Sequence, residues 1–228
     1  MAEARTYDYA GNIEDVLRNA HEYHTAAYAA ETFRGPSLYF HERCMATLGD
    51  GITEQRLEYI YGTLASWGMH RMGKGGSKMR PFADFRDSVL ASEAMVAELQ
   101  STEMEDMNAE GWGLLRQFFR QIRVMATGTT LVGNSKVMAH LTPNLVPPID
   151  RQYTLKYLRG STNIRNDLRA EWLTMRDLLE NFFYRVALEP RFTEAAAEWA
   201  SSPDQYPWDT SALKIVDNLL IGAMKARE

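Results

Sequence analysis

A lysine and an aspartate flank two prolines in "TTLVGNSKVMAHLTPNLVPPID", and these two residue types together could carry out nucleophilic or acid–base chemistry. Lys136 stands near the start of an expected short helix, and Asp150 follows Pro147 and Pro148. An amine becomes a nucleophile when burial or neighbouring cations depress its pKa. An ionised carboxylate beside it can move a proton or stabilise positive charge. Lys136 and Asp150 are therefore the candidate catalytic residues of one cleft.

Both residues also have an ordinary structural interpretation. An aspartate in front of "RQYTLKYL" is a typical helix N-cap, and a solvated lysine needs no partner. The two interpretations of Asp150 are compatible, because a cap holds its carboxylate rigidly in place. The positions of the two side chains in the fold decide between the catalytic and the structural interpretation. One concave pocket lined by Lys136 and Asp150 favours chemistry, whereas separate exposure favours a non-enzymatic helical binding protein.

Hydrophobic residues recur with helical spacing along almost the whole chain, which predicts an all-α fold. Thr53 is expected to cap one of the helices, and a short helix is expected over residues 135–141. We expect a single helical domain over residues 1–228, the alternative being two lobes over 1–110 and 111–228. No repeat, strand alternation or low-complexity tract interrupts this pattern.

A glycine-containing turn joins two amphipathic helices ahead of Lys136. Gly128 and Gly133 bracket this turn, and glycine permits positive φ and a close approach of the backbone to another chain. Asn134 and Ser135 are expected to cap the second helix and to leave N–H groups free at its amino end. Such an end attracts phosphate, so the residues Gly133, Asn134 and Ser135 are candidates for a phosphate or nucleic-acid contact.

This arrangement resembles the helix-hairpin-helix DNA glycosylases over residues 116–158. In that family the hairpin grips a DNA phosphate, the lysine, where present, attacks the sugar C1′ to form a Schiff base, and the aspartate stabilises the oxocarbenium ion or activates the nucleophile. The resemblance implies that Gly133 belongs to the phosphate grip, Lys136 is the nucleophile, Asp150 is the acid and DNA is the partner. This chain departs from the family in having one glycine in "LVGNSK" where the family has Gly-x-Gly.

A second resemblance covers two separate motifs. The chain resembles an uncharacterised bacterial family with a "LASWGM-R" helix and a lysine-to-"P-x-x-D-R" segment. The pairing of the two motifs implies that they meet in space. The matching residues are Leu64, Ala65, Ser66, Trp67, Gly68, Met69 and Arg71, then Lys136, Pro147, Asp150, Arg151 and Tyr153.

The loop that follows the tryptophan helix is basic. "SWGMHRMGKGGSKMR" carries Arg71, Lys74 and Lys78, and no acid occurs between Glu58 and Asp84. Glycines interleaved with Lys and Ser can form an anion-binding nest, so these three cations are candidate phosphate contacts. The alternatives are a solvated loop and a small-molecule enzyme that uses this loop to hold phosphate.

Three aromatic residues and one further arginine complete the candidate site. A base that leaves the stack must enter a pocket, which Trp67, Trp112 and Tyr153 are expected to line. Trp67 at helical spacing is also compatible with an ordinary core position. Arg151 is a candidate nucleic-acid contact whose charge would help to depress the pKa of Lys136.

The remaining candidates are histidines and the single cysteine. His21 and His24 are three residues apart on a helix and could face one metal ion, but a solvated pair is the commoner pattern. We predict no metal and no other cofactor. Cys44 lacks a convincing histidine partner and is interpreted as a buried thiol.

Charge and hydropathy bound the partners and the compartment. The formal net charge of −5 argues against non-specific nucleic-acid binding, although residues 111–192 hold 12 Lys/Arg against 6 Asp/Glu. No apolar stretch is long enough to span a membrane, the first residues do not resemble a secretion signal, and one cysteine suits a reducing compartment. These features predict a cytoplasmic protein. They leave the substrate and the oligomeric state open.

Overall fold

Helices form nearly all of the regular structure, and the predicted all-α class is confirmed. A computed structural model describes residues 7–29, 34–73 and 76–227. The helices of the first half are α1 (Tyr9–Arg18), α2 (Ala20–Ala29), α3 (Pro36–Ala46), α4 (Glu54–Leu64), α5 (Phe82–Leu90) and α6 (Glu93–Gln100). Those of the second half are α7 (Ala109–Gln121), α8 (Leu131–Leu141), α9 (Lys156–Arg159), α10 (Leu168–Leu178), α11 (Tyr184–Ala187), α12 (Pro190–Ala200) and α13 (Ala212–Lys225).

Short irregular elements connect the helices. Three π-helical turns extend or precede them: η3 (Ala65–Met69), η5 (Arg151–Leu155) and η6 (Leu179–Phe183). Single 3₁₀ turns occur at η2 (Leu48–Asp50) and η4 (Met104–Asp106). A two-residue antiparallel pair, β1 (Met72–Gly73) with β2 (Gly76–Ser77), lies after η3. The helix that precedes η3 starts as the sequence predicts, because the Thr53 hydroxyl accepts a hydrogen bond from Arg56 N at 3.1 Å.

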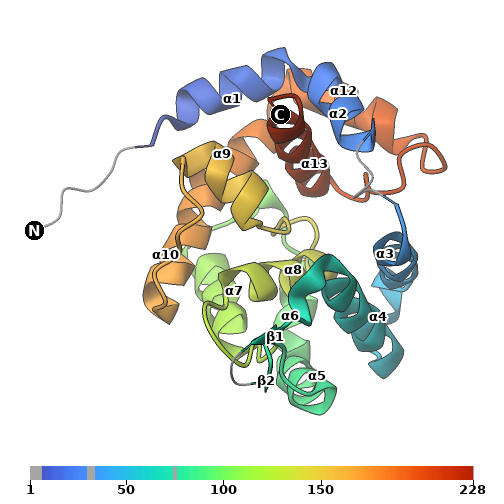
Figure 1. Ribbon diagram of the computed structural model, residues 1–228, viewed down its shortest axis with the longest axis vertical. Helices are drawn as coiled ribbons and strands as arrows, with labels where there is room; N and C mark the ends of the chain where they lie inside the picture. Colours follow the sequence, from blue (N-terminus) through green and yellow to red (C-terminus); the bar gives the residue numbers. More distant parts are fainter. Residues whose placement is uncertain (1–6, 30–33, 74–75, 228) are drawn as a thin grey trace, which may run out of the picture.

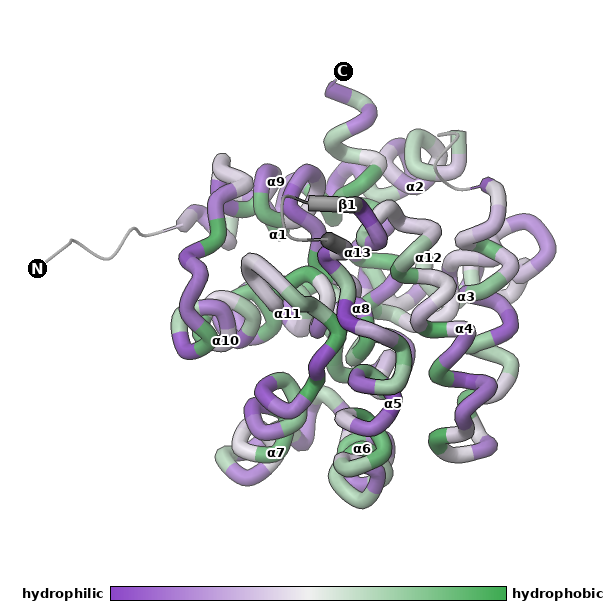
Figure 2. Tube along the Cα trace, turned by 60° about the horizontal axis from the view of Figure 1, so that its bottom comes forward, coloured by the Kyte–Doolittle hydropathy of each residue, from purple (hydrophilic) through white to green (hydrophobic). Residues whose placement is uncertain are grey.

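Two helices with apolar residues on most of their faces organise the molecule. α8 lies near the middle of the molecule in Figures 1 and 2 and contacts α4, α7 and α10, while α13 packs along α2. Nine of the eleven residues of α8 are buried, and four of these nine are polar. Both helices also carry polar side chains that line one pocket.

The crossing of α2 and α13 depends on a single glycine. A Cβ atom added at Gly222 would lie 1.7 Å from the backbone oxygen of Tyr23, which is far inside van der Waals contact. A residue without a side chain therefore lets the two backbones touch. This contact sets how far α13 lies from α2.

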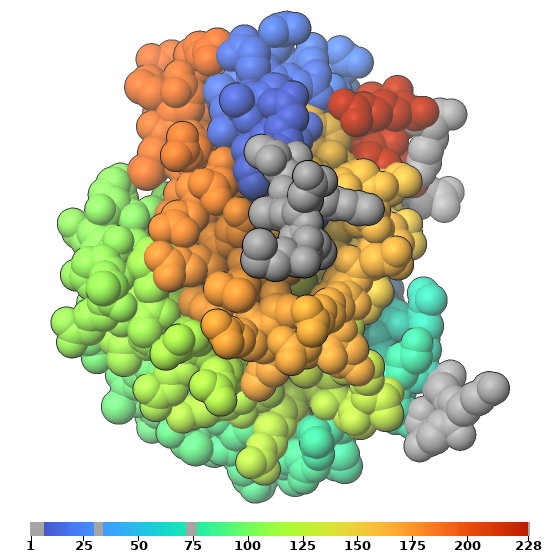
Figure 3. Space-filling model, turned by 90° about the vertical axis from the view of Figure 1, so that its left-hand side faces the viewer, coloured from blue at the N-terminus to red at the C-terminus, as the bar shows by residue number. Residues whose placement is uncertain are grey.

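One hydrophobic cluster contains residues from both of the sequence segments 1–110 and 111–228. Phe85 and Leu64 of the first segment belong to the same cluster as Phe119 and Leu141 of the second. In Figure 3, α10 lies on the outer face between α1 and the region of α7. The apolar faces of both segments are thus buried against each other.

The connection between α7 and α8 differs from the expected glycine hairpin. After α7 the chain runs extended along residues 78–80: Arg80 N donates to Val124 O at 3.0 Å, and Ala126 N donates to Lys78 O at 2.8 Å. The helix-hairpin-helix element is therefore not confirmed. Pairing with a segment more than forty residues earlier in the chain takes the place of a local turn.

α8 begins at Leu131 rather than at the expected residue 135. The carboxylate of Glu171, on α10, accepts hydrogen bonds from Thr130 N and Leu131 N, both at 2.6 Å. The predicted caps Asn134 and Ser135 are therefore wrong. They lie inside the helix, where a carboxylate about forty residues later in the chain already occupies the amino end.

Cys44 is buried, as predicted. Its thiol has no exposed surface, and burial raises the pKa of Cys44 to about 11. A thiol with such a pKa holds its proton at neutral pH and is a poor nucleophile. Among the described residues, no helix is both long enough and apolar enough to cross a lipid bilayer.

Candidate functional site

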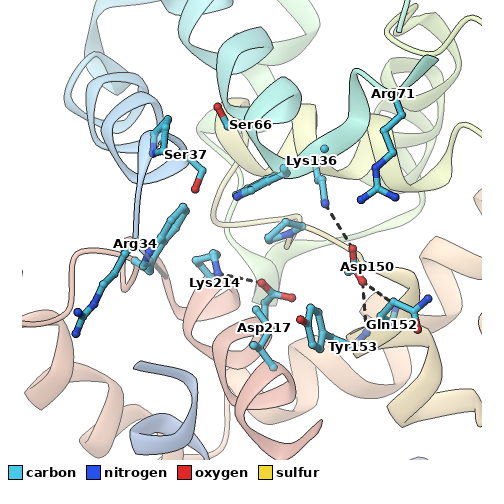
Figure 4. A pocket seen from close by; sticks show the side chains of 16 residues that line it. Arg34, Ser37, Ser66, Arg71, Lys136, Asp150, Gln152, Tyr153, Lys214 and Asp217 are labelled. Carbon is cyan, nitrogen blue, oxygen red and sulfur yellow. Dashed lines mark hydrogen bonds and ion pairs between the residues drawn. The ribbon is translucent and has the colours of Figure 1, made fainter. Parts of the chain in front are cut away.

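A cavity of about 610 Å³ lies where four parts of the fold meet. Its walls come from the start of α3, from η3 and the residues after it, from α8 with the 148–153 segment, and from α13. Figure 4 shows Lys136 pointing from α8 toward Asp150, with Lys214 and Asp217 of α13 on the other side. The cavity has the size of a small-molecule or single-nucleotide site.

Lys136 lies in the middle of α8, and its side chain is only 9% exposed. Its Nζ is 3.5 Å from Asp150 Oδ2 and 4.7 Å from the centre of the Trp67 ring. Burial lowers the pKa of Lys136, and the negative charge of Asp150 opposes this shift. The amine is therefore partly desolvated, yet it is held beside an acid and against an aromatic face.

Asp150 both caps η5 and faces Lys136. One oxygen accepts hydrogen bonds from Gln152 N at 2.7 Å and Tyr153 N at 3.4 Å, so the predicted N-cap is confirmed. The other oxygen, Oδ2, faces the lysine. The Asp150 side chain is 30% exposed and remains open to the cavity. Asp150 thus caps η5 and contacts Lys136 at the same time.

A hydroxyl inside α8 fixes the approach to Asp150. Ser135 Oγ accepts a hydrogen bond from Ile149 N at 3.1 Å and donates to Val132 O. Pro147 and Pro148 stiffen the segment between these points. Ser135 thus ties the backbone next to Asp150 to the helix that carries Lys136.

Several other predicted residues lie in the same cavity. Trp67, Tyr153 and Arg71 all line it, so the tryptophan helix and the Lys136 segment do meet in space. Gly68 at the end of η3 has a φ of 73°. This conformation favours glycine and turns the chain so that Arg71 comes back to the cavity rim.

Two predicted residues do not line the cavity. Trp112 packs in the core on α7, with its ring stacked on Tyr184 at 5.8 Å, so its assignment to the pocket is corrected. Arg151 points away and donates to Thr129 Oγ1 and to Thr162 O at 3.3 Å. Trp112 is held by packing in the core and Arg151 by hydrogen bonds within the fold.

The predicted phosphate contacts are also placed differently. Gly133 is buried within α8, where a Cβ would come 2.7 Å from a side-chain carbon of Met125, and Asn134 donates to Phe119 O at 2.7 Å. Lys78 is exposed but does not line the cavity, and Lys74 lies outside the described residues. The Gly133–Ser135 segment therefore offers no exposed amino end to a phosphate.

A second ammonium–carboxylate pair, which was not predicted from the sequence, lines the same cavity. Lys214 Nζ lies 3.0 Å from Asp217 Oδ2 and also donates to Asn218, all on α13. Burial raises the pKa of Asp217, and Lys214 opposes the shift. Asp217 Oδ1 has no hydrogen-bond partner among the residues that the structure describes. The signal in the sequence was a lysine, an aspartate and an asparagine at i, i+3 and i+4 of an otherwise apolar helix.

A pair of buried histidines supports α8 from behind. His140 Nδ1 lies 2.7 Å from Lys136 O, and His140 Nε2 lies 3.0 Å from His41 Nδ1. Because a carbonyl only accepts, His140 donates from Nδ1, and its Nε2 accepts from His41 Nδ1. The remaining nitrogen of His41, Nε2, then accepts from the Thr210 hydroxyl. Burial lowers the pKa of His140 to about 4 and that of His41 well below its usual value. Both rings are therefore neutral at pH 7.

His24 is buried too, which corrects its interpretation as part of a solvated pair. Its Nε2 lies 2.7 Å from Asp209 Oδ2, and its ring stacks on Trp199 at 4.0 Å. Asn218 donates to Asp209 Oδ1 at 2.7 Å, which links this cluster to Lys214. Among the described residues, no group of three or more His, Cys, Asp or Glu side chains is arranged to hold a metal ion.

Comparison of the chain with protein-family models, with curated proteins and with solved structures found no match.

Proposed function

We propose that the cavity is an active site that cleaves an N-glycosidic bond in a nucleic acid, with Lys136 as nucleophile and Asp150 as acid. The observation that supports this is the meeting of the two side chains, 3.5 Å apart, in one concave pocket. A helix cap and a solvated lysine would need no such meeting. The resemblance to helix-hairpin-helix glycosylases gives the pair its chemistry.

The proposed reaction begins with a proton transfer. Asp150 takes a proton from the Lys136 ammonium, whose pKa burial lowers. The amine electron pair then forms a bond to the sugar C1′ while the C1′–N bond breaks, and the base leaves with that bonding pair and takes the proton from Asp150. A proton then passes from the lysine nitrogen to the ring oxygen as the bond between C1′ and the ring oxygen breaks, and the opened sugar is held as a protonated Schiff base.

The apolar side of the cavity suits a flipped base. Trp67, Trp208 and Tyr153 line it, and aromatic faces stack on any base. The Trp67 face is shared with the Lys136 ammonium, at 4.7 Å. A base stacked at this wall would leave its sugar near the amine.

Two cations at the rim take over the role that the resemblance gave to the glycine turn. Arg34 and Arg71 are exposed and line the mouth of the cavity. Guanidinium groups bind phosphate through several hydrogen bonds at once. In this proposal they contact the strand that the buried residue Gly133 cannot reach.

Borohydride trapping tests the proposal. The full chain is incubated with a panel of duplexes that carry damaged bases or abasic sites, and the Schiff base is reduced to a stable covalent adduct. We expect an adduct with the wild type and with Lys156→Ala, an exposed lysine outside the cavity, but none with Lys136→Ala. Lack of any adduct, or an adduct that survives Lys136→Ala, rules out Lys136 as the nucleophile.

DNA binding gives a second measurement. Phosphate contacts release counterions, so binding should weaken steeply as salt rises, and Arg71→Ala should reduce the slope by about one contact. If DNA binding is undetectable at low salt, a nucleic acid is not the substrate.

A non-enzymatic binding pocket is the second candidate. Its supporting observation is that Lys136 and Asp150 already neutralise each other while Asp150 caps η5. Such a pocket would bind its ligand without forming an adduct, and Lys136→Ala would weaken binding only.

A further inference from the structure

The amino end of α3 opens into the cavity without a side-chain cap. Gly35 occupies the N-cap position with a φ of 98°, and Pro36 follows at the first position of the helix. The first N–H groups of an α-helix have no partner within the helix and carry a partial positive charge. Arg34, Pro36 and Ser37 all line the cavity, so this end of the eleven-residue helix faces its interior.

Ser37 gives an independent indication of a ligand. Its residue surface is only 7% exposed, and Figure 4 shows its hydroxyl pointing into the cavity. Within the part of the chain that the structure describes, no residue forms a hydrogen bond with this hydroxyl. The hydroxyl oxygen is open to the cavity, so a bound group there can accept its proton.

The charge of the cavity favours an anion. Its lining contains four cationic residues and two carboxylates, a formal excess of two positive charges. Arg34 stands directly before the α3 cap. An anion at the helix end would meet the helix dipole and the Ser37 hydroxyl, whereas the Arg34 guanidinium points away from Ser37 in Figure 4.

We propose that the amino end of α3, with Ser37, is a phosphate subsite of this cavity. A phosphate group has enough oxygens to accept hydrogen bonds from a backbone N–H and a hydroxyl at once. The subsite holds the phosphate of the nucleotide whose sugar lies beside Lys136 and Asp150. That assignment of the substrate rests on the proposed function, whereas the binding of phosphate itself does not.

Calorimetric titration with inorganic phosphate at constant ionic strength tests the subsite. We expect Ser37→Ala to weaken phosphate binding by about tenfold, because a hydrogen bond to a charged group is lost. Ser66→Ala is the matched control. Ser66 lines the same cavity but donates its hydroxyl to Gly62 O at 2.8 Å, so its removal should leave the affinity unchanged. Equal affinities for wild type and Ser37→Ala overturn the proposal.

A third variant guards against an effect of Ser37→Ala on folding. Ser37→Asp places a carboxylate in the first turn of α3, where it stabilises the helix end and repels a bound anion. We expect this variant to melt at or above the temperature of the wild type and to lose the rise in Tm that phosphate gives the wild type. A Tm that still rises with phosphate in Ser37→Asp contradicts the subsite.

Four probes distinguish a free nucleotide from a nucleic acid as the source of the phosphate. A deoxynucleoside 5′-monophosphate is compared with its nucleoside, and an oligodeoxynucleotide is compared with the same strand carrying a 5′-phosphate. Ser37-dependent binding of the monophosphate alone assigns a free nucleotide. The same dependence on the unphosphorylated strand assigns a phosphate within nucleic acid. Ser37-dependent phosphate binding without a trapped adduct keeps the subsite and rejects the Lys136 chemistry, and the reverse result rejects the subsite alone.

Discussion

Two ammonium–carboxylate pairs face one cavity, and they are built differently. Lys136 and Asp150 come from separate elements, lie 3.5 Å apart and leave the carboxylate 30% exposed. Lys214 and Asp217 lie one turn apart on α13, at 3.0 Å, with both side chains at most 8% exposed. The first pair is open to a ligand, whereas the second is enclosed and shares its ammonium with Asn218.

The difference shows how the same two groups take different roles. An enclosed pair that has been desolvated must stay paired, because either charge alone is strongly unfavourable inside a protein. A pair with one solvated member can exchange its partner for a substrate at small cost. This difference is why the proposed chemistry rests on Lys136 and Asp150, whereas Lys214 and Asp217 are expected to have a structural and electrostatic role.

The largest expected effect is on stability and concerns the enclosed pair. Lys214→Met leaves the carboxylate of Asp217 buried without its ammonium, and we expect a loss of about 3–5 kcal/mol in the free energy of unfolding. Lys136→Met should change the same quantity by about 1 kcal/mol or less, since Asp150 can be solvated. Urea denaturation measures both variants. Equal losses would show that the two pairs do not differ in kind.

A pH effect of similar size concerns His140, which donates a hydrogen bond to the backbone carbonyl of Lys136. The enclosed pair has no such histidine on its lysine carbonyl among the residues that the structure describes. The native pKa of His140, about 4, lies below the usual 6.5, so the unfolded chain binds more protons between these values. The stability from a neutral His140 is complete above pH 6.5 and is lost as pH falls toward 4. It amounts to about 3 kcal/mol.

The variant His140→Asn isolates this contribution from those of other groups, including Asp217, whose raised pKa acts in the opposite sense. The difference in the free energy of unfolding between wild type and variant should be largest above pH 6.5 and should shrink on acidification. A constant difference between pH 7 and pH 4 would mean that His140 titrates normally in the folded protein.

A smaller effect separates the cap from the chemistry of Asp150. Asparagine is as good a helix cap as aspartate, so Asp150→Asn should keep most of the stability, whereas Asp150→Ala should lose about 1 kcal/mol more. Both substitutions should abolish borohydride trapping if the carboxylate is needed. Normal trapping with Asp150→Asn would leave this residue with the cap alone.

The smallest expected effect is the difference in cation–π coupling between the two lysines and their aromatic partners. Lys136 lies 4.7 Å from the ring centre of Trp67, and Lys214 lies 5.5 Å from that of Trp208. Double-mutant cycles with Lys→Met and Trp→Leu should give a coupling of about 0.5–1 kcal/mol for the nearer pair and less for the other. The reverse order would place the stronger cation–π contact at the enclosed pair.

The sequence predicts what depends on neighbouring residues. Helical spacing gives the all-α class, and short-range rules give the caps at Thr53 and Asp150. The two matching motifs also led to the correct expectation that Trp67 lies near Lys136. These features need little knowledge of the rest of the chain.

What the sequence does not reveal depends on residues far apart in the chain. Glu171 moves the start of α8 by four residues, and Lys214 reaches the cavity from a helix almost eighty residues after Lys136. Trp112 shows a related difficulty, because an inward-facing tryptophan looks the same in sequence whether it lines a cavity or fills the core. Tertiary contacts decide such cases.

The burial of Cys44 has a practical consequence for experiments on this protein. The chain contains one cysteine, and its thiol is enclosed and protonated at neutral pH. A cysteine introduced at Gln152, an exposed residue that lines the cavity, would be the only accessible thiol, so a fluorophore would attach there without further mutations. Each arrival of a ligand at the mouth of the cavity could then be followed optically, in the otherwise native chain.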